Sequence, residues 1–251
     1  MSENKMYTLD EIESSPISRL QTGHKYLDPI FGKSIINGRE QFGLPYGKIT
    51  LIASAPGVGK TRFATDLAIT MNANGLRVLV FQNEVTPSEY KGWIKRSVKF
   101  PKSFFVANYS NLQDQIDAIK KCKPSIVICD SVNMIDDYDS SKEIRKIMED
   151  YKQTAQDIGC HVMFIGHLNK KDEVKGNNDL EYLIDINCKL TPYTGEGANS
   201  SIQNSLKSMF VLEVGKNRYG TSGGWCCFKH VETGIEYVCG SEDPRIKNLA
   251  R

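Results

Sequence analysis

Short apolar runs alternate with amphipathic segments through the middle of the chain. From Ile49 onwards the runs ITLIA, RVLVFQ, FFVAN, SIVIC and HVMFI are separated by helix-like segments. Continuous apolar strands between helices are typical of a parallel sheet that is covered on both faces. We therefore expect an α/β fold with a mostly parallel, twisted sheet and helices on both faces, in which ligands gather at the carboxyl ends of the strands.

The segment after RVLVFQ carries a helix start signal. Thr86 can act as the N-cap, Pro87 suits the first helical position, and Glu89 follows three residues after the threonine. This combination is a capping box, in which two backbone N–H groups are satisfied by side chains. It predicts a helix that begins at Pro87.

The pattern changes after residue 165. A polar loop, LNKKDEVKGNNDLE, precedes an expected strand, LIDINCKL, and the later stretch SMFVLEVGKNRYGTSGGWCCFKHVETGIEYV predicts antiparallel hairpins with glycine turns. We expect one folded unit over residues 17–240, with a parallel core and a C-terminal antiparallel hairpin extension. Residues 1–16 and 241–251 are expected to be tails.

Composition limits the classes of partner. The 251 residues include 32 basic and 30 acidic side chains, a net charge of +2, so any basic binding site must be local. No apolar run approaches the roughly 20 residues that a membrane helix needs, and the amino terminus lacks the apolar core of a signal peptide. We expect a cytoplasmic protein with no membrane partner.

The stretch SAPGVGKT, residues 54–61, lies between an apolar strand and a helix. It matches the phosphate-binding loop GxxxxGK(S/T) except that Ser54 replaces the first glycine, and a plain glycine-rich turn is the alternative. Backbone N–H groups of such a loop bind phosphates, the lysine reaches the terminal phosphates of ATP, and the threonine hydroxyl binds Mg2+. The expected nucleotide-binding residues are Ala55, Pro56, Gly57, Val58, Gly59, Lys60, Thr61 and Arg62.

Two carboxylates follow apolar strands. Asp130 closes PSIVICD and is expected to help Thr61 hold magnesium, although such an aspartate is also a common helix cap or turn former. Glu84 closes RVLVFQNE and is a candidate base for water near the γ-phosphate; the alternative is a solvated loop glutamate.

Six segments together resemble the RecA-like P-loop ATPases, and in particular the core of the bacterial RadA/Sms recombination and repair family. They are ISRLQTGHKYLDPIFG, LPYGKITLIASAPGVGKT, VFQNE, VICDS, IGHLNKKDEVKGNNDLEYLID and GKNRYG, and the resemblance covers about residues 17–238. The family's four-cysteine zinc finger and Lon-like domain have no counterpart in the sequence, so functions tied to them are not carried over. Residues 32–43 look like an insertion.

The resemblance implies roles for five residues in catalysis. Besides Lys60, Glu84 would be the catalytic glutamate, His167 would sense the γ-phosphate, and Lys216 with Arg218 would act on ATP bound by the neighbouring subunit of a ring, expected to be a hexamer. The alternatives are a core histidine at 167 and two solvated cations beside a turn.

Single-stranded DNA is the expected partner. Lys170, Lys171 and Lys175 cluster in a polar loop, where cations can follow a phosphate backbone. The loop after Asp130 is acidic, which argues against DNA binding by both loops.

We therefore expect an ATP-hydrolysing motor that acts on single-stranded DNA in recombination, repair or replication. A replicative ring-helicase motor domain and a regulatory ATPase of the KaiC type, acting on protein partners, remain alternatives. The acidic loop and the near-neutral charge favour the regulatory alternative to some extent.

Overall fold

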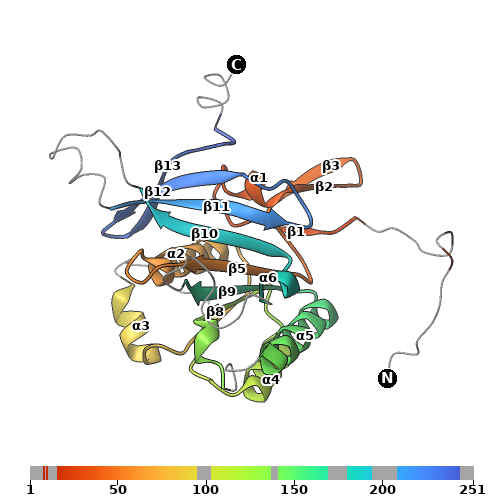
Figure 1. Ribbon diagram of the computed structural model, residues 1–251, viewed down its shortest axis with the longest axis vertical. Helices are drawn as coiled ribbons and strands as arrows, with labels where there is room; N and C mark the ends of the chain where they lie inside the picture. Colours follow the sequence, from red (N-terminus) through yellow and green to blue (C-terminus); the bar gives the residue numbers. More distant parts are fainter. Residues whose placement is uncertain are drawn as a thin grey trace.

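The computed structural model describes residues 8, 10, 16–94, 103–136, 141–168, 180–193 and 208–243. Within them, nine strands form one sheet in the order β13-β12-β11-β10-β5-β9-β8-β6-β7 (Figure 1). The six strands from β10 to β7 run parallel to their neighbours, whereas β10, β11, β12 and β13 pair antiparallel. The strands are β5 (Ile49–Ser54), β6 (Val78–Gln82), β7 (Phe104–Ala107), β8 (Ile126–Asp130), β9 (His161–His167), β10 (Ile186–Pro192), β11 (Met209–Asn217), β12 (Trp225–Val231) and β13 (Gly234–Gly240). This architecture confirms the predicted parallel core with an antiparallel extension.

Helices cover both faces of the parallel part of the sheet. On one face, α2 (Lys60–Ala73) packs through Phe63 against Ile52 of β5. On the other, α4 (Leu112–Cys122) and α5 (Ser141–Ile158) lie side by side and pack with Leu51 of β5 (Figure 1). Because successive strand residues point to opposite faces, a strand buried on both faces must be apolar throughout, which explains the continuous apolar runs.

The predicted capping box is confirmed at the start of α3 (Pro87–Trp93). The Thr86 side chain accepts a hydrogen bond from the Glu89 backbone N–H at 3.3 Å, and the Glu89 carboxylate accepts one from the Thr86 N–H at 2.9 Å. The box fixes where the chain turns into α3, two residues after Glu84.

The segment before β5 carries two small two-stranded sheets, and its apolar residues join the core that lies under α2. β1 (Arg19–Leu20) pairs with β4 (Leu44–Pro45), α1 spans Asp28–Phe31, and the predicted insertion folds into the hairpin of β2 (Lys33–Ile36) and β3 (Arg39–Phe42). The buried guanidinium of Arg19 donates to the carbonyl groups of Phe31, Gly43 and Tyr219. It thereby ties this segment to the turn after β11.

Two short helices complete the described elements: the 3-10 helix η2 (Val132–Met134) and α6 (Leu180–Leu183). None of the helices formed by the described residues combines the length and apolar character that a membrane crossing requires.

Candidate functional site

The loop between β5 and α2 has the backbone that a phosphate cradle needs. Gly57 has a φ of 80° and Gly59 a φ of 102°, both in the left-handed region that favours glycine. A Cβ on Gly59 would also lie 2.3 Å from Nε2 of His230, so the loop is closely packed at this point. Gly59 is the N-cap of α2 and brings no side-chain cap, so the first N–H groups of the helix are left to face a ligand.

Ser54, the departure from the loop pattern, is the last residue of β5 and is buried. Its hydroxyl donates to the carbonyl of Ala55 at 2.8 Å. Its backbone φ is not positive, so the position does not require glycine. The serine therefore continues the strand, and its hydroxyl is used in a hydrogen bond to the chain's own backbone.

Lys60 lies over the start of the same loop. Its ammonium donates to the carbonyl groups of Ser54 at 3.3 Å and Ala55 at 3.2 Å. Burial lowers the pKa of Lys60, and the charge of Asp130 opposes that shift. The lysine is thus held in the loop with its charge favoured by a carboxylate.

Asp130 ends β8 beside the loop, as predicted, and is buried. Its carboxylate accepts a hydrogen bond from Gln82 Nε2 at 3.3 Å and is hydrogen-bonded to the side chain of Thr61. Burial raises the pKa of Asp130, and the hydrogen bond from Thr61 counteracts this. A carboxylate and a hydroxyl brought together in this way are oxygen ligands of the kind that magnesium prefers, so the two side chains fit that ion.

Glu84 and His167 meet at the carboxyl ends of the strands, where Asp130 also lies. Nε2 of His167 lies 3.1 Å from Oε1 of Glu84, although 83 residues separate them in the sequence. The His167 N–H donates to the Asn133 side chain at 3.4 Å, and the Glu84 N–H donates to the Gln82 side chain at 3.0 Å. A carboxylate paired with an imidazole can orient a water molecule and take up its proton.

Two polar residues near this pair stand out in the structure. In the described part of the chain, the side-chain amide of Asn83 and the hydroxyl of Ser131 are buried without a hydrogen-bond partner. Asn83 precedes Glu84, and Ser131 follows Asp130. Polar atoms buried in this way are costly unless a ligand or water satisfies them, so both residues belong to the candidate site.

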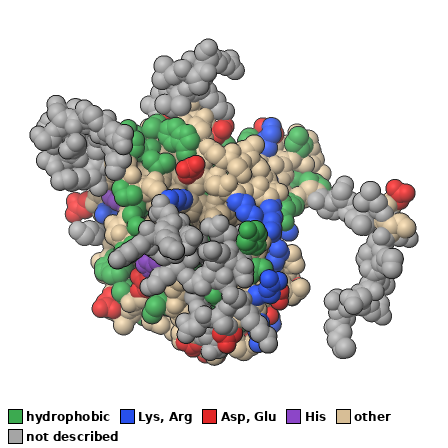
Figure 2. All heavy atoms as spheres, viewed as in Figure 1, with side chains coloured by type: hydrophobic (Ala, Val, Ile, Leu, Met, Phe, Trp, Pro, Cys, Tyr) green, Lys and Arg blue, Asp and Glu red, His purple; other side chains and the backbone are tan. Residues whose placement is uncertain are grey.

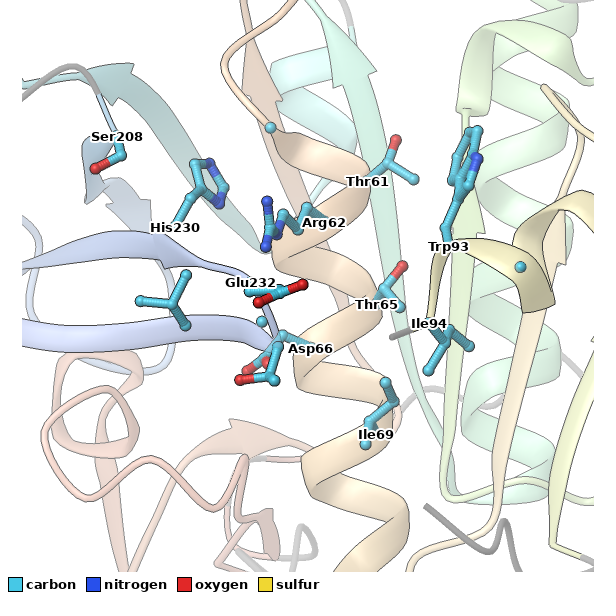
Figure 3. A pocket seen from close by; sticks show the side chains of 15 residues that line it. Thr61, Arg62, Thr65, Asp66, Ile69, Trp93, Ile94, Ser208, His230 and Glu232 are labelled. Carbon is cyan, nitrogen blue, oxygen red and sulfur yellow. The ribbon is translucent and has the colours of Figure 1, made fainter. Parts of the chain in front are cut away.

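A cavity of about 800 Å³ runs along α2 from Gly59 and Thr61. Figure 3 shows Trp93 on one side of the helix, and Arg62 and His230 on the other. His230 Nε2 lies 3.1 Å from the carbonyl of Val58, inside the phosphate loop. No sequence motif pointed to this histidine, which lies near the end of β12.

Lys216 and Arg218 lie elsewhere. β11 ends beside the beginning of β10, which in turn lies beside Thr50 near the amino end of β5. Thr50 is four residues before Ser54, so at about 3.3 Å per strand residue this end of the strands lies roughly 13 Å from Ser54. The structure therefore does not bring these two cations to the phosphate loop of the same chain. Lys170, Lys171 and Lys175 lie outside the described residues.

Basic side chains gather along the flank of the molecule that carries α5 and α6 (Figures 1 and 2). Arg218 belongs to this flank, because it donates a hydrogen bond to the carbonyl of Tyr182 in α6 at 2.7 Å.

Comparisons with known proteins agree with this architecture. The model of a family described as "AAA domain" matches residues 35–173. The DNA repair protein RadA of Mycolicibacterium smegmatis is 26% identical over 227 residues, which cover 86% of this chain and 44% of that protein. RadA of Aquifex aeolicus is 25% identical over 232 residues, covering 90% and 48%. The chain thus spans about half the length of these relatives.

A solved structure of an ATPase domain from another protein shares the fold. It superimposes with a TM-score of 0.61 at 18% identity, and the match covers 76% of this chain and 84% of that domain. Together with the RadA relatives, this likeness confirms the predicted RecA-like P-loop architecture and its relation to RadA.

Proposed function

Because the chain belongs to the AAA domain family, we propose that it is an ATP-hydrolysing motor acting on single-stranded DNA in recombination, repair or replication. One observation carries the ATPase part of the proposal. Around one loop, Lys60 and Thr61 at the start of α2 meet three side chains from the carboxyl ends of separate strands, namely Asp130, Glu84 and His167. The DNA part is supported by the names of the RadA relatives, which are DNA repair proteins.

The proposed roles follow from the chemistry of each side chain. The loop N–H groups and Lys60 bind the phosphates of ATP, and Thr61 with Asp130 would hold magnesium, which neutralises phosphate charge when bound. Glu84 orients the attacking water and accepts its proton. His167 restrains Glu84 through their 3.1 Å contact and responds to the γ-phosphate.

Lys216 and Arg218 are proposed to act on ATP bound by the neighbouring subunit of a ring, with a hexamer as the expected assembly. The two residues lie near the amino end of β5, whereas the chain's own phosphate loop follows its carboxyl end, and this separation supports the role. A cation brought across an interface stabilises the negative charge that develops in phosphoryl transfer. Hydrolysis would then depend on assembly.

Steady-state ATP hydrolysis with and without single-stranded DNA tests the proposal, with Lys60→Ala as the blank. We expect stimulation by DNA that weakens steeply as salt rises, because phosphate contacts release counterions. Strand displacement on a forked duplex would assign the motor to the helicase alternative. An ATP hydrolysis rate that is the same with and without DNA at every salt concentration would overturn the proposed action on DNA and favour a regulatory ATPase.

A further inference from the structure

Both proposed cross-subunit cations are attached to the short segment that precedes β10. Lys216 donates to the carbonyl of Ile184 at 3.1 Å, and the Arg218 guanidinium donates to the carbonyl of Tyr182 at 2.7 Å. The Arg218 backbone N–H donates to the carbonyl of Asp185 at 3.1 Å. The end of β11 and the turn after it are therefore fixed to residues 182–185 through both backbone and side-chain hydrogen bonds.

Asp185 is the charged centre of this attachment. Its carboxylate is fully buried, and Oδ2 accepts a hydrogen bond from the Ile49 N–H at 3.0 Å, at the start of β5. Oδ1 lies 3.4 Å from Arg218 Nη1 and 3.5 Å from Lys152 Nζ of α5. A buried carboxylate is tolerated only when it is paired, so the two cations and the N–H group form a connected set.

Nη1 of Arg218 faces the Asp185 carboxylate, and Nη2 donates to the carbonyl of Tyr182. The Arg218 side chain is 41% exposed, whereas that of Asp185 is not exposed at all. A guanidinium has five N–H donors in a rigid plane, so fixing part of the plane directs the rest. The carboxylate therefore limits the directions in which Arg218 can present its outer N–H groups to another molecule.

We infer that Asp185 is a positioning residue for Arg218, and through the adjacent Ile184 carbonyl for Lys216, in their action on the neighbouring subunit's ATP. The inference rests on the proposed function. Because the Asp185 side chain is fully buried, it acts through the exposed cation and not on a nucleotide directly. It fixes the orientation of Arg218 before the subunits assemble, so no conformational entropy of a flexible side chain has to be lost when they do.

Mixed assemblies separate this role from a structural one. Glu84→Gln disables a subunit's own site but leaves its cations, and Arg218→Ala does the reverse. In an equal mixture of the two variants, half of the subunits keep an intact ATP site and the other half keep intact cations. About one quarter of the subunit junctions then join an intact site to an intact cation and should hydrolyse ATP. No recovery in this mixture would overturn the cross-subunit role and, with it, the inference.

Asp185→Asn is the decisive variant. Asparagine keeps an oxygen for the Ile49 N–H and loses the charge that faces Arg218. An assembly made only of Asp185→Asn subunits should have a kcat at least about tenfold lower than the unaltered protein. Its KM for ATP should change less than about twofold, because the phosphate loop of each subunit is intact. It should recover turnover when mixed with Glu84→Gln but not with Arg218→Ala.

The contrary results are equally clear. Turnover at the level of the unaltered protein would overturn the inference, and so would a failure to recover with Glu84→Gln while Arg218→Ala recovers. Lys152→Met is the matched control, since it removes the other cation from the same carboxylate; we expect it to keep most of the turnover. If Asp185→Asn does not fold, the double variant Asp185→Asn/Lys152→Met removes the carboxylate and that cation together, and the same mixtures decide.

Discussion

His161 is buried at the start of β9 and bridges two segments. Its Nδ1 lies 2.8 Å from the carbonyl of Pro45, and its Nε2 lies 3.0 Å from the hydroxyl of Thr50. A carbonyl only accepts, so Nδ1 carries the proton and Nε2 accepts from Thr50. The neutral ring therefore satisfies both partners, and burial lowers its pKa to about 4.

This histidine should make folding sensitive to acid. Between its ordinary pKa of 6.5 and the folded value of about 4, the unfolded chain binds a proton that the folded chain does not. The free energy of unfolding should therefore fall as the pH falls through this window. Relative to His161→Gln, the unaltered protein should lose about 2 kcal/mol between pH 7 and pH 5, measured by urea denaturation. Equal losses in the two proteins would contradict the assignment.

At the scale of elements, α3 depends on its first turn. The helix spans Pro87–Trp93, too short for its own hydrogen bonds to stabilise it, and the capping box satisfies N–H groups that the helix leaves free. It also connects Glu84 to Trp93, which lines the cavity along α2.

Thr86→Ala removes the side-chain acceptor of the box. We expect the free energy of unfolding to fall by about 1 kcal/mol, whereas Thr86→Ser should stay within a few tenths of the unaltered protein. Urea denaturation with an unchanged m-value would assign the loss to the folded state. Equal stability of the alanine and serine variants would show that the box contributes nothing.

The elements that the sequence predicted are those with a strong local pattern. Apolar runs identified β5, β6, β7, β8 and β9, and the phosphate loop fixed the start of α2, because each signal lies within a few adjacent residues. Which strands lie side by side is not encoded in that way. β5 pairs with β9 and β10 and not with β6, the next strand of the sheet along the chain.

Strand order explains what the sequence left open in the site. Glu84 was expected near the phosphates from its place after an apolar strand, and His167 from the resemblance, but their contact exists because β6 and β9 both pair with β8. His230 reaches Val58 through a hairpin extension that could have folded away from the loop. Such contacts follow from the tertiary packing of several strands, which the residue pattern of any one strand does not predict.

At the scale of the whole molecule, the phosphate loop and the Arg218 turn occupy opposite ends of β5. If the site is completed by a neighbour, turnover per chain should rise with protein concentration and fall on dilution, since assembly obeys mass action. Arg218→Ala should show low turnover at all concentrations, by about a thousandfold at saturation. Initial rates over a dilution series test this, and constant turnover per chain would contradict it.

The separation of these two ends would give the proposed ring a direction. In a ring, each subunit offers the donor at one end to one neighbour and receives a donor at its loop from the other neighbour, so it uses two different patches. Contacts between two different patches are heterologous, head-to-tail contacts, which either close into a ring or continue as a helical filament. Such an assembly is polar: every subunit points the same way around it, and a strand bound along it would meet all subunits in one orientation.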